Sequence, residues 1–106
     1  MVYVVQEVKG RDHSPALKYG DLKLVLEDWP NITMSTQPTI RRLKKILKDF
    51  NDQDYLLLSG DPVAIGLACA VAADINQGKV KILKWENREG LYYALEANMR
   101  GGFTDE

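Results

Sequence analysis

The chain has 106 residues, of which 45% are hydrophobic, and this length accommodates a single hydrophobic core. A formal net charge of −1 and 27% charged residues exclude a polycation for nucleic acid, an acidic tail and a disordered chain. One cysteine and one histidine allow neither an internal disulfide nor a conventional zinc site, so we predict no metal and no cofactor.

The location and domain organisation follow from the same composition. Residues 1–7 do not resemble a signal peptide, and the longest uncharged run, residues 62–73, is shorter than the ~20 residues that span a bilayer. We therefore expect a soluble, cytoplasmic protein without a membrane partner. Residues 1–98 are predicted to form one α/β domain, and residues 99–106 a flexible tail with little to bury.

The first predicted elements are two strands separated by a loop. Residues 2–5 are β-branched or aromatic and apolar on both faces, which is typical of a buried strand. Residues 9–20 contain the glycines and the proline of a loop, with one helical turn at residues 15–18. Residues 22–27 alternate between apolar and polar side chains and predict a half-exposed strand, followed by a loop over residues 28–37.

The next predicted element is an amphipathic helix. Its apolar residues recur at three- and four-residue steps from Ile40 to Phe50. Pro38 is expected at the first helical position, with Ser35 and Thr36 before it as capping candidates.

The second half of the chain alternates between strands and a helix. Residues 55–58 are a short apolar run between polar boundaries and predict a central strand. A second helix is expected over residues 62–76, ended by a glycine. Residues 79–85 and 91–96 predict two strands joined by a hairpin turn at residues 87–90.

The order β-β-α-β-α-β-β predicts an α/β (α+β) two-layer sandwich, with a mixed five-stranded sheet and two helices on one face. We predict the strand order 2-1-3-4-5, because the first strand is more apolar than the second and belongs inside the sheet. Right-handed crossovers then place both helices on the same face. If each element reverses direction, strands two to four are mutually parallel, and strands one and five oppose them.

Apolar surface on two elements predicts self-association. The second helix is apolar around its whole circumference, and one sheet face with the first helix covers only part of it. On the open sheet face we expect Tyr3, Val5, alternate residues of 55–58, and either Leu83 or Trp85. We therefore predict a homo-oligomer, a dimer or larger. The alternative is a monomer whose two long loops fold over these surfaces.

Three residues after the central strand are candidates for a ligand-binding site: Ser59, Gly60 and Asp61. Ligands bind at the carboxyl ends of strands in open α/β sheets, and the amides of a helix start attract anions. The segment lacks the spacing of known phosphate-binding loops. The alternative is structural, with Asp61 as a helix cap and Gly60 in a turn.

Five of the fourteen basic residues lie within eight positions of the first predicted helix, namely Arg41, Arg42, Lys44, Lys45 and Lys48. A basic helix of this kind is a candidate for contact with nucleic-acid phosphates. The alternative is a solvated or partner-facing surface, since acidic residues follow at once and no aromatic residues are interleaved.

We predict no catalytic residue. His13 lies in a loop beside Asp12 and Ser14, and a Ser-His-Asp arrangement would need a convergence in space that the sequence does not show. Cys69 lies among alanines and valines with no adjacent cation, which is typical of a core residue.

Several segments resemble small proteins encoded by tailed bacteriophages and prophages, namely residues 55–68, 74–76 and 81–85, the opening residues 2–7, and residues 37–43. The resemblance covers most of residues 1–95. It implies a viral context and carries no catalytic residue and no assigned activity.

The leading hypothesis is therefore a non-enzymatic, homo-oligomeric phage-type protein that binds another macromolecule inside the infected cell. One alternative is a small-ligand binder or enzyme that uses residues 59–61. Another is a nucleic-acid accessory protein that uses the basic helix, residues 41–48.

Overall fold

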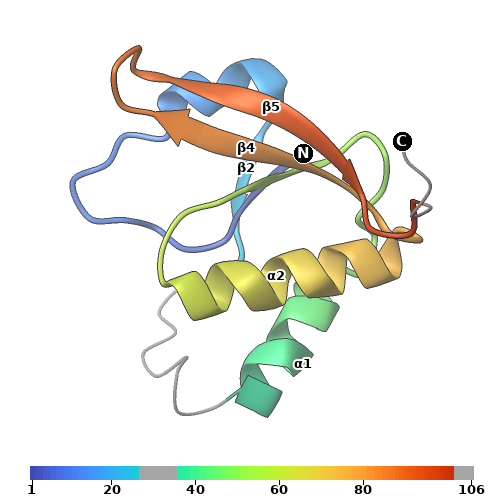
Figure 1. The fold of residues 1–106 in the computed structure, drawn as a ribbon. Helices are drawn as coiled ribbons and strands as arrows, with labels where there is room; N and C mark the ends of the chain where they lie inside the picture. The colour runs from blue at the N-terminus through green and yellow to red at the C-terminus, as the bar shows by residue number, and fades with distance from the viewer. Residues whose placement is uncertain (27–35, 102–106) are drawn as a thin grey trace.

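The structure is a computed structural model that describes residues 1–26 and 36–101. Its elements are, in chain order, β1 (Val2–Val4), the 3-10 helix η1 (Ser14–Tyr19), β2 (Leu22–Leu24), α1 (Thr36–Ile46), β3 (Tyr55–Leu57), α2 (Pro62–Ile75), β4 (Lys79–Glu86) and β5 (Leu91–Asn98). The five strands form one mixed sheet in the order β2-β1-β3-β4-β5. Strands β2, β4 and β5 are labelled in Figure 1. The predicted α/β fold and strand order are confirmed.

The direction of the first strand was predicted wrongly. β1 pairs in parallel with both β2 and β3, and β3 pairs in parallel with β4, so only β5 runs antiparallel. The error comes from the first connection, which we treated as a simple reversal. Because η1 lies between β1 and β2, this connection is a crossover that returns the chain to the end of the sheet where β1 began.

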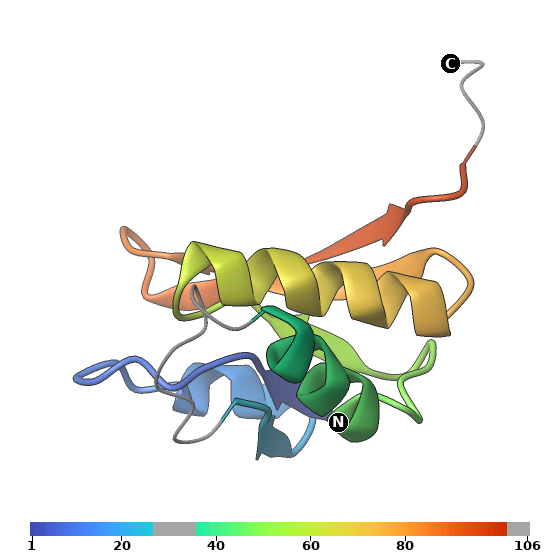
Figure 2. The same ribbon diagram turned by 90° about the horizontal axis from the view of Figure 1, so that it is seen from below.

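The same connections decide which face each helix covers. The step from β1 to β2 crosses the sheet in one direction, and the steps from β2 to β3 and from β3 to β4 cross it in the other. Right-handed crossovers therefore place η1 on one face and both α-helices on the opposite face. Figures 1 and 2 show α1 and α2 together on one side of the sheet, with η1 on the other side.

The core between the sheet and the two α-helices contains residues that we expected on the open face. Tyr3 and Val5 are buried here, together with Leu56 of β3 and Leu43 of α1. The Tyr3 ring lies 5.8 Å from the ring of Phe50, measured between centroids. The prediction for Tyr3 and Val5 was wrong because residues 2–5 are apolar throughout, and such a strand gives no sign of which face meets the helices.

A second, smaller core lies on the opposite sheet face. It contains Val4, Leu57, Leu83 and Tyr92, which belong to four different strands, and Ala16 of η1 packs against them. Either Leu83 or Trp85 was expected on this face; Leu83 is buried in this core, and Trp85 packs at the edge of the same cluster. The predicted loop over residues 9–20 therefore covers part of this face, as in the monomer alternative. The second loop of that alternative lies largely outside the described residues.

Both predicted helices are present, and α1 differs from the prediction at both ends. α2 begins after Asp61 and ends at Ile75, within one residue of the prediction. α1 includes Thr36 and Gln37 ahead of Pro38, so Pro38 does not occupy the first helical position and Thr36 is not a cap before it. Ser35, the other capping candidate, lies outside the described residues. α1 ends at Ile46, and a turn follows in which the Phe50 N–H donates to the Leu47 carbonyl at 2.9 Å. This turn brings the Phe50 ring into the core.

Candidate functional site

The junction between β3 and α2 holds the three predicted ligand-binding residues next to Gln6, which follows β1. The buried Ser59 hydroxyl donates to the Gln6 backbone carbonyl. The Gln6 side-chain carbonyl accepts from the Asp61 N–H at 2.8 Å. The Asp61 carboxylate in turn accepts from the Val63 N–H at 2.7 Å, which caps α2. These bonds join β1, β3 and α2.

Gln6 also occupies the space beside Gly60. Gly60 has a φ of +104°, and a Cβ at this position would lie 2.5 Å from the Cβ of Gln6. A ligand at this junction would therefore have to displace Gln6 and compete with the bonds that Ser59 and Asp61 already make. Ligand binding by Ser59, Gly60 and Asp61 stays a prediction. The sequence does not indicate Gln6, because it lies 53 residues from Ser59 along the chain.

The cationic residues of α1 and the turn after it stand free of acidic partners within the described residues. The ion pairs among these residues join the amino terminus to Asp54 and Lys79 to Asp52. The exposed members of the basic group are Arg41, Lys44, Lys45 and Lys48, and Arg42 is half-buried with an unpartnered Nε. This gives α1 a cationic, solvated outer face. Nucleic-acid contact by this face stays a prediction.

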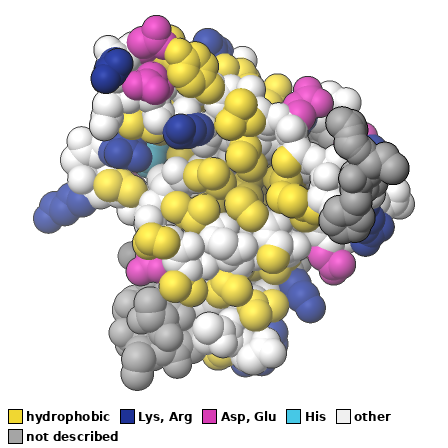
Figure 3. Space-filling model, viewed as in Figure 1, with side chains coloured by type: hydrophobic (Ala, Val, Ile, Leu, Met, Phe, Trp, Pro, Cys, Tyr) yellow, Lys and Arg dark blue, Asp and Glu magenta, His cyan; other side chains and the backbone are white. Residues whose placement is uncertain are grey.

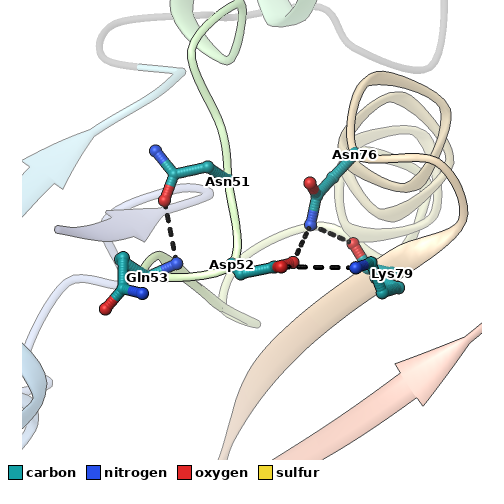
Figure 4. Close-up of polar contacts among 5 residues, drawn as sticks. All are labelled: Asn51, Asp52, Gln53, Asn76 and Lys79. Atoms are coloured by element: carbon teal, nitrogen blue, oxygen red, sulfur yellow. Dashed lines mark hydrogen bonds and ion pairs between the residues drawn. The ribbon is translucent and has the colours of Figure 1, made fainter.

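A polar cluster lies where α2 ends and β4 begins (Figure 4). The Asn76 amide donates to the Asp52 carboxylate at 2.9 Å and to the Lys79 carbonyl at 3.0 Å. The Lys79 ammonium lies 3.2 Å from the same carboxylate. The bond from Asn76, followed by the bond and charge of Lys79, lowers the pKa of Asp52. The cluster ties the turn before β3 to the α2–β4 connection, beside an open groove of about 550 Å³.

His13 makes a contact that excludes the triad arrangement in this structure. Its Nδ1 lies 2.7 Å from the hydroxyl of Tyr92, whereas Asp12 accepts from the Ser14 N–H and hydroxyl, each at 2.9 Å. Burial, followed by the positive charge of Arg11, lowers the pKa of His13. The residue therefore connects the segment before η1 to β5.

The remaining candidates for chemistry are the Cys69 thiol and clusters of metal-ligating side chains. Cys69 is half-buried, and burial raises the pKa of its thiol, which disfavours the reactive thiolate. In residues 1–26 and 36–101, no three histidine, cysteine, aspartate or glutamate side chains come together as metal ligands.

Strand β5 carries exposed hydrophobic side chains on one of its faces. In the antiparallel register, Tyr93, Leu95 and Ala97 lie opposite Lys84, Ile82 and Val80 of β4. Directly opposed residues share a face, and Ile82 and Val80 pack into the helix-side core, so these three β5 side chains lie on the helix side. Helix α2 lies under the β4 region and leaves the outer part of β5 uncovered (Figures 1 and 2). Tyr93 is 44% exposed and Leu95 is 47% exposed.

This apolar surface continues onto α2. Met99 extends the β5 row and lines a shallow groove of about 490 Å³ against α2. We call the combined apolar area the α2–β5 surface and define it as Gly66, Cys69, Ala70, Tyr93, Leu95, Ala97 and Met99. Asp74 and Arg100 also line the groove and give it a charged margin. Figure 3 shows hydrophobic side chains gathered across this side of the molecule. Sequence analysis indicated the α2 part of this surface from its all-round apolar character and missed the β5 part.

A family model described as "Phage Pam3 gp32-like protein" matches residues 1–99. The chain belongs to this family. Membership confirms the resemblance to small phage-encoded proteins. Comparisons with curated proteins and with solved structures give no match.

The Pam3 gp32-like family supplies a phage context, and its description names no activity. Among the described residues, no helix is both long and apolar enough to cross a bilayer. The functional argument therefore depends on the surfaces that this chain presents.

Proposed function

We propose that this Pam3 gp32-like chain is a non-enzymatic, homo-oligomeric phage protein that binds another macromolecule in the cytoplasm of the infected cell. The α2–β5 surface is the observation that supports the homo-oligomeric part of this proposal, and the family supports its phage context. Two large hydrophobic side chains, Tyr93 and Leu95, are nearly half exposed on one side of a single strand. Exposed apolar residues gathered in one patch are typical of interaction sites, whereas scattered ones are ordinary.

Burial of the α2–β5 surface would contribute favourable free energy to association. Complete burial of a large apolar side chain contributes about 1.5–3 kcal/mol relative to full exposure. Tyr93, Leu95 and Met99 are each 44–62% exposed, and a symmetric dimer would bury each of them twice. Self-association therefore covers this surface without requiring any other partner.

The test is the mass of the particle in solution as a function of concentration. We expect light scattering after size exclusion to show more than one chain per particle for the native protein. Leu95→Glu should shift the particle toward the single chain. Leu17→Glu is the matched control, because Leu17 is a leucine of similar exposure, 54%, on η1 and outside the α2–β5 surface. A native protein that remains a single chain at every concentration would contradict the proposal.

A second candidate function is nucleic-acid binding through α1, favoured by the cations on its outer face, which have no acidic partner in the part of the chain that the structure describes. The expected result is a shift of DNA or RNA in a gel that weakens steeply as salt rises, because bound phosphates release counterions. Reversal of Arg41, Lys44 and Lys45 to glutamate should abolish the shift. A shift that persists in this variant, or no shift at low salt, removes this candidate.

A further inference from the structure

We infer that two copies of the chain pair β5 against β5 in antiparallel fashion, around a two-fold axis that runs perpendicular to the sheet at Ala94. The two five-stranded sheets then form one continuous sheet of ten strands, with all four α-helices on one face. This inference rests on the self-association proposed above and adds its geometry.

The two edges of the sheet differ in the features that prevent edge pairing. β2 has three residues, and the exposed Lys23 stands in its middle. β5 has eight residues and contains no lysine, proline or glycine. Free edges in natural proteins are commonly short, or carry lysine or proline, because a long regular edge pairs with other chains. β5 therefore has the character of a strand that is paired on both sides.

The backbone of β5 presents the groups that such pairing needs. The Met99 N–H donates to the Gly78 carbonyl on the β4 side at 2.6 Å. Backbone groups alternate in direction along an antiparallel strand, so those of Tyr92, Ala94 and Glu96 point away from β4. With the axis at Ala94, the two copies of Ala94 form one hydrogen-bonded pair. Tyr92 and Glu96 form another pair on each side of it.

The side chains on the helix side fit this register. A residue and its opposite in the second copy lie symmetrically about position 94, so Tyr93 lies opposite Leu95 and Leu91 lies opposite Ala97. In each pair, Tyr93 of one copy packs against Leu95 of the other, and these are the two exposed large hydrophobic side chains of β5. Aromatic–aliphatic pairs directly across two strands stabilise a sheet.

The charges on the other face are also compatible. Glu96 is the only charged residue of β5, and this register places it opposite Tyr92 instead of opposite itself. A neighbouring register, centred at Leu95, would require the Asn98 carbonyl to pair with the second copy. That carbonyl already accepts from the Gly101 N–H at 3.2 Å, which favours the axis at Ala94.

The experiment is a disulfide cross-link at the predicted axis. The variant carries Ala94→Cys together with Cys69→Ala, which removes the native thiol. Hydrogen-bonded pairs in antiparallel sheets have Cα atoms about 5.5 Å apart, within the range of about 4.4–6.8 Å that a disulfide spans. The matched control carries Lys23→Cys with Cys69→Ala and places the thiol on the other edge strand. Mild oxidation should give a covalent dimer for Ala94→Cys and a single chain for Lys23→Cys.

A second measurement uses substitutions that leave the single chain intact, because Ala94 is exposed. Ala94→Lys places two ammonium groups directly opposite each other at the axis, whereas Ala94→Val keeps the position neutral. Like charges directly opposed across strands destabilise the pairing, so the dimer dissociation constant should rise roughly fivefold or more in Ala94→Lys relative to Ala94→Val.

The outcomes distinguish β5–β5 pairing from self-association in general. If the native protein self-associates but both cysteine variants cross-link equally, or neither does, the β5 pairing is wrong and self-association stands. An unchanged dissociation constant in Ala94→Lys leads to the same conclusion. If the native protein is a single chain throughout, both the inference and the proposed self-association are wrong.

Discussion

The two ends of the sheet are built differently. At the parallel end, β1 and β3 are covered by α1 and α2 on one face and by η1 on the other, and every residue of β1 is buried. At the β4–β5 end, Tyr92 is the one residue of β5 that is fully buried. A crossover connection contains a helix that can cover the sheet, whereas a hairpin adds a strand without adding a covering helix. The open end is thus where this fold leaves room for a partner.

The largest difference in the free energy of unfolding should appear between two variants that each truncate one leucine, one at each end of the sheet. Leu57→Ala removes a fully buried side chain of a central strand and should lower the free energy of unfolding by about 2–5 kcal/mol. Leu95→Ala should cost less than about 1 kcal/mol at concentrations where the chain is single, because its side chain is 47% exposed. Urea unfolding monitored by circular dichroism measures both. Equal losses would show that β5 is covered within one chain.

The closed end can be probed next at Gly60. Gly60→Ala places a Cβ at a φ of +104° and 2.5 Å from the Gln6 Cβ, and should destabilise the fold by roughly 1–3 kcal/mol. Gly90→Ala is the control, since Gly90 also has a positive φ, +64°, but no atom within 4 Å of the added Cβ. Thermal melts of the two variants should show the larger loss for Gly60→Ala. The reverse order would mean that Gln6 does not fill this junction in solution.

A smaller effect is expected at the start of α2. Asp61→Ala removes the carboxylate that accepts from the Val63 N–H and should cost about 0.5–2 kcal/mol of folding free energy. Asp61→Asn keeps an oxygen in the same place and should remain close to the native stability. Urea unfolding of the pair checks this. A loss of similar size in both variants would indicate that the charge, and not the cap, is what matters.

His13 should give the hairpin end a modest dependence on pH. Its pKa in the folded protein is lowered by burial, so the unfolded chain binds more protons near the unperturbed pKa of about 6.5. Stability is therefore complete above that value and is lost as pH falls through it toward the folded pKa. His13→Asn should remove this loss between pH 7.5 and pH 5.5 in urea unfolding. A slope that persists in the variant would assign the effect to other groups.

The sequence predicted the elements and their order because the apolar patterns are strong. The start of α2 follows from a proline and a cap, and its end is followed by Gln77 and Gly78, which both have a positive φ; the sequence indicated only the glycine. The direction and facing of β1 were not predictable, because residues 2–5 are apolar on both sides and the role of η1 as a crossover depends on packing. When both faces of a strand are apolar, the sequence does not indicate which face meets which layer, and the neighbouring elements decide it.

The candidate surfaces were predictable only in part. The sequence predicted exposed apolar surface on α2, because this helix is apolar around its whole circumference. The exposure of Tyr93 and Leu95 was not predictable, because it depends on how far α2 extends across the sheet. That distance is set by packing between segments far apart in the chain. The contact of Gln6 with residues 59–61 has the same origin, because it forms only when β1 pairs with β3.

Amide hydrogen exchange on β5 tests the interface between copies most directly. We predict that the amides of Tyr92, Ala94 and Glu96 exchange more slowly as protein concentration rises, while the exposed edge of β2 exchanges at a constant rate. Exchange at β5 that is rapid and independent of concentration would contradict the account, and would show that this edge of the sheet remains open to water.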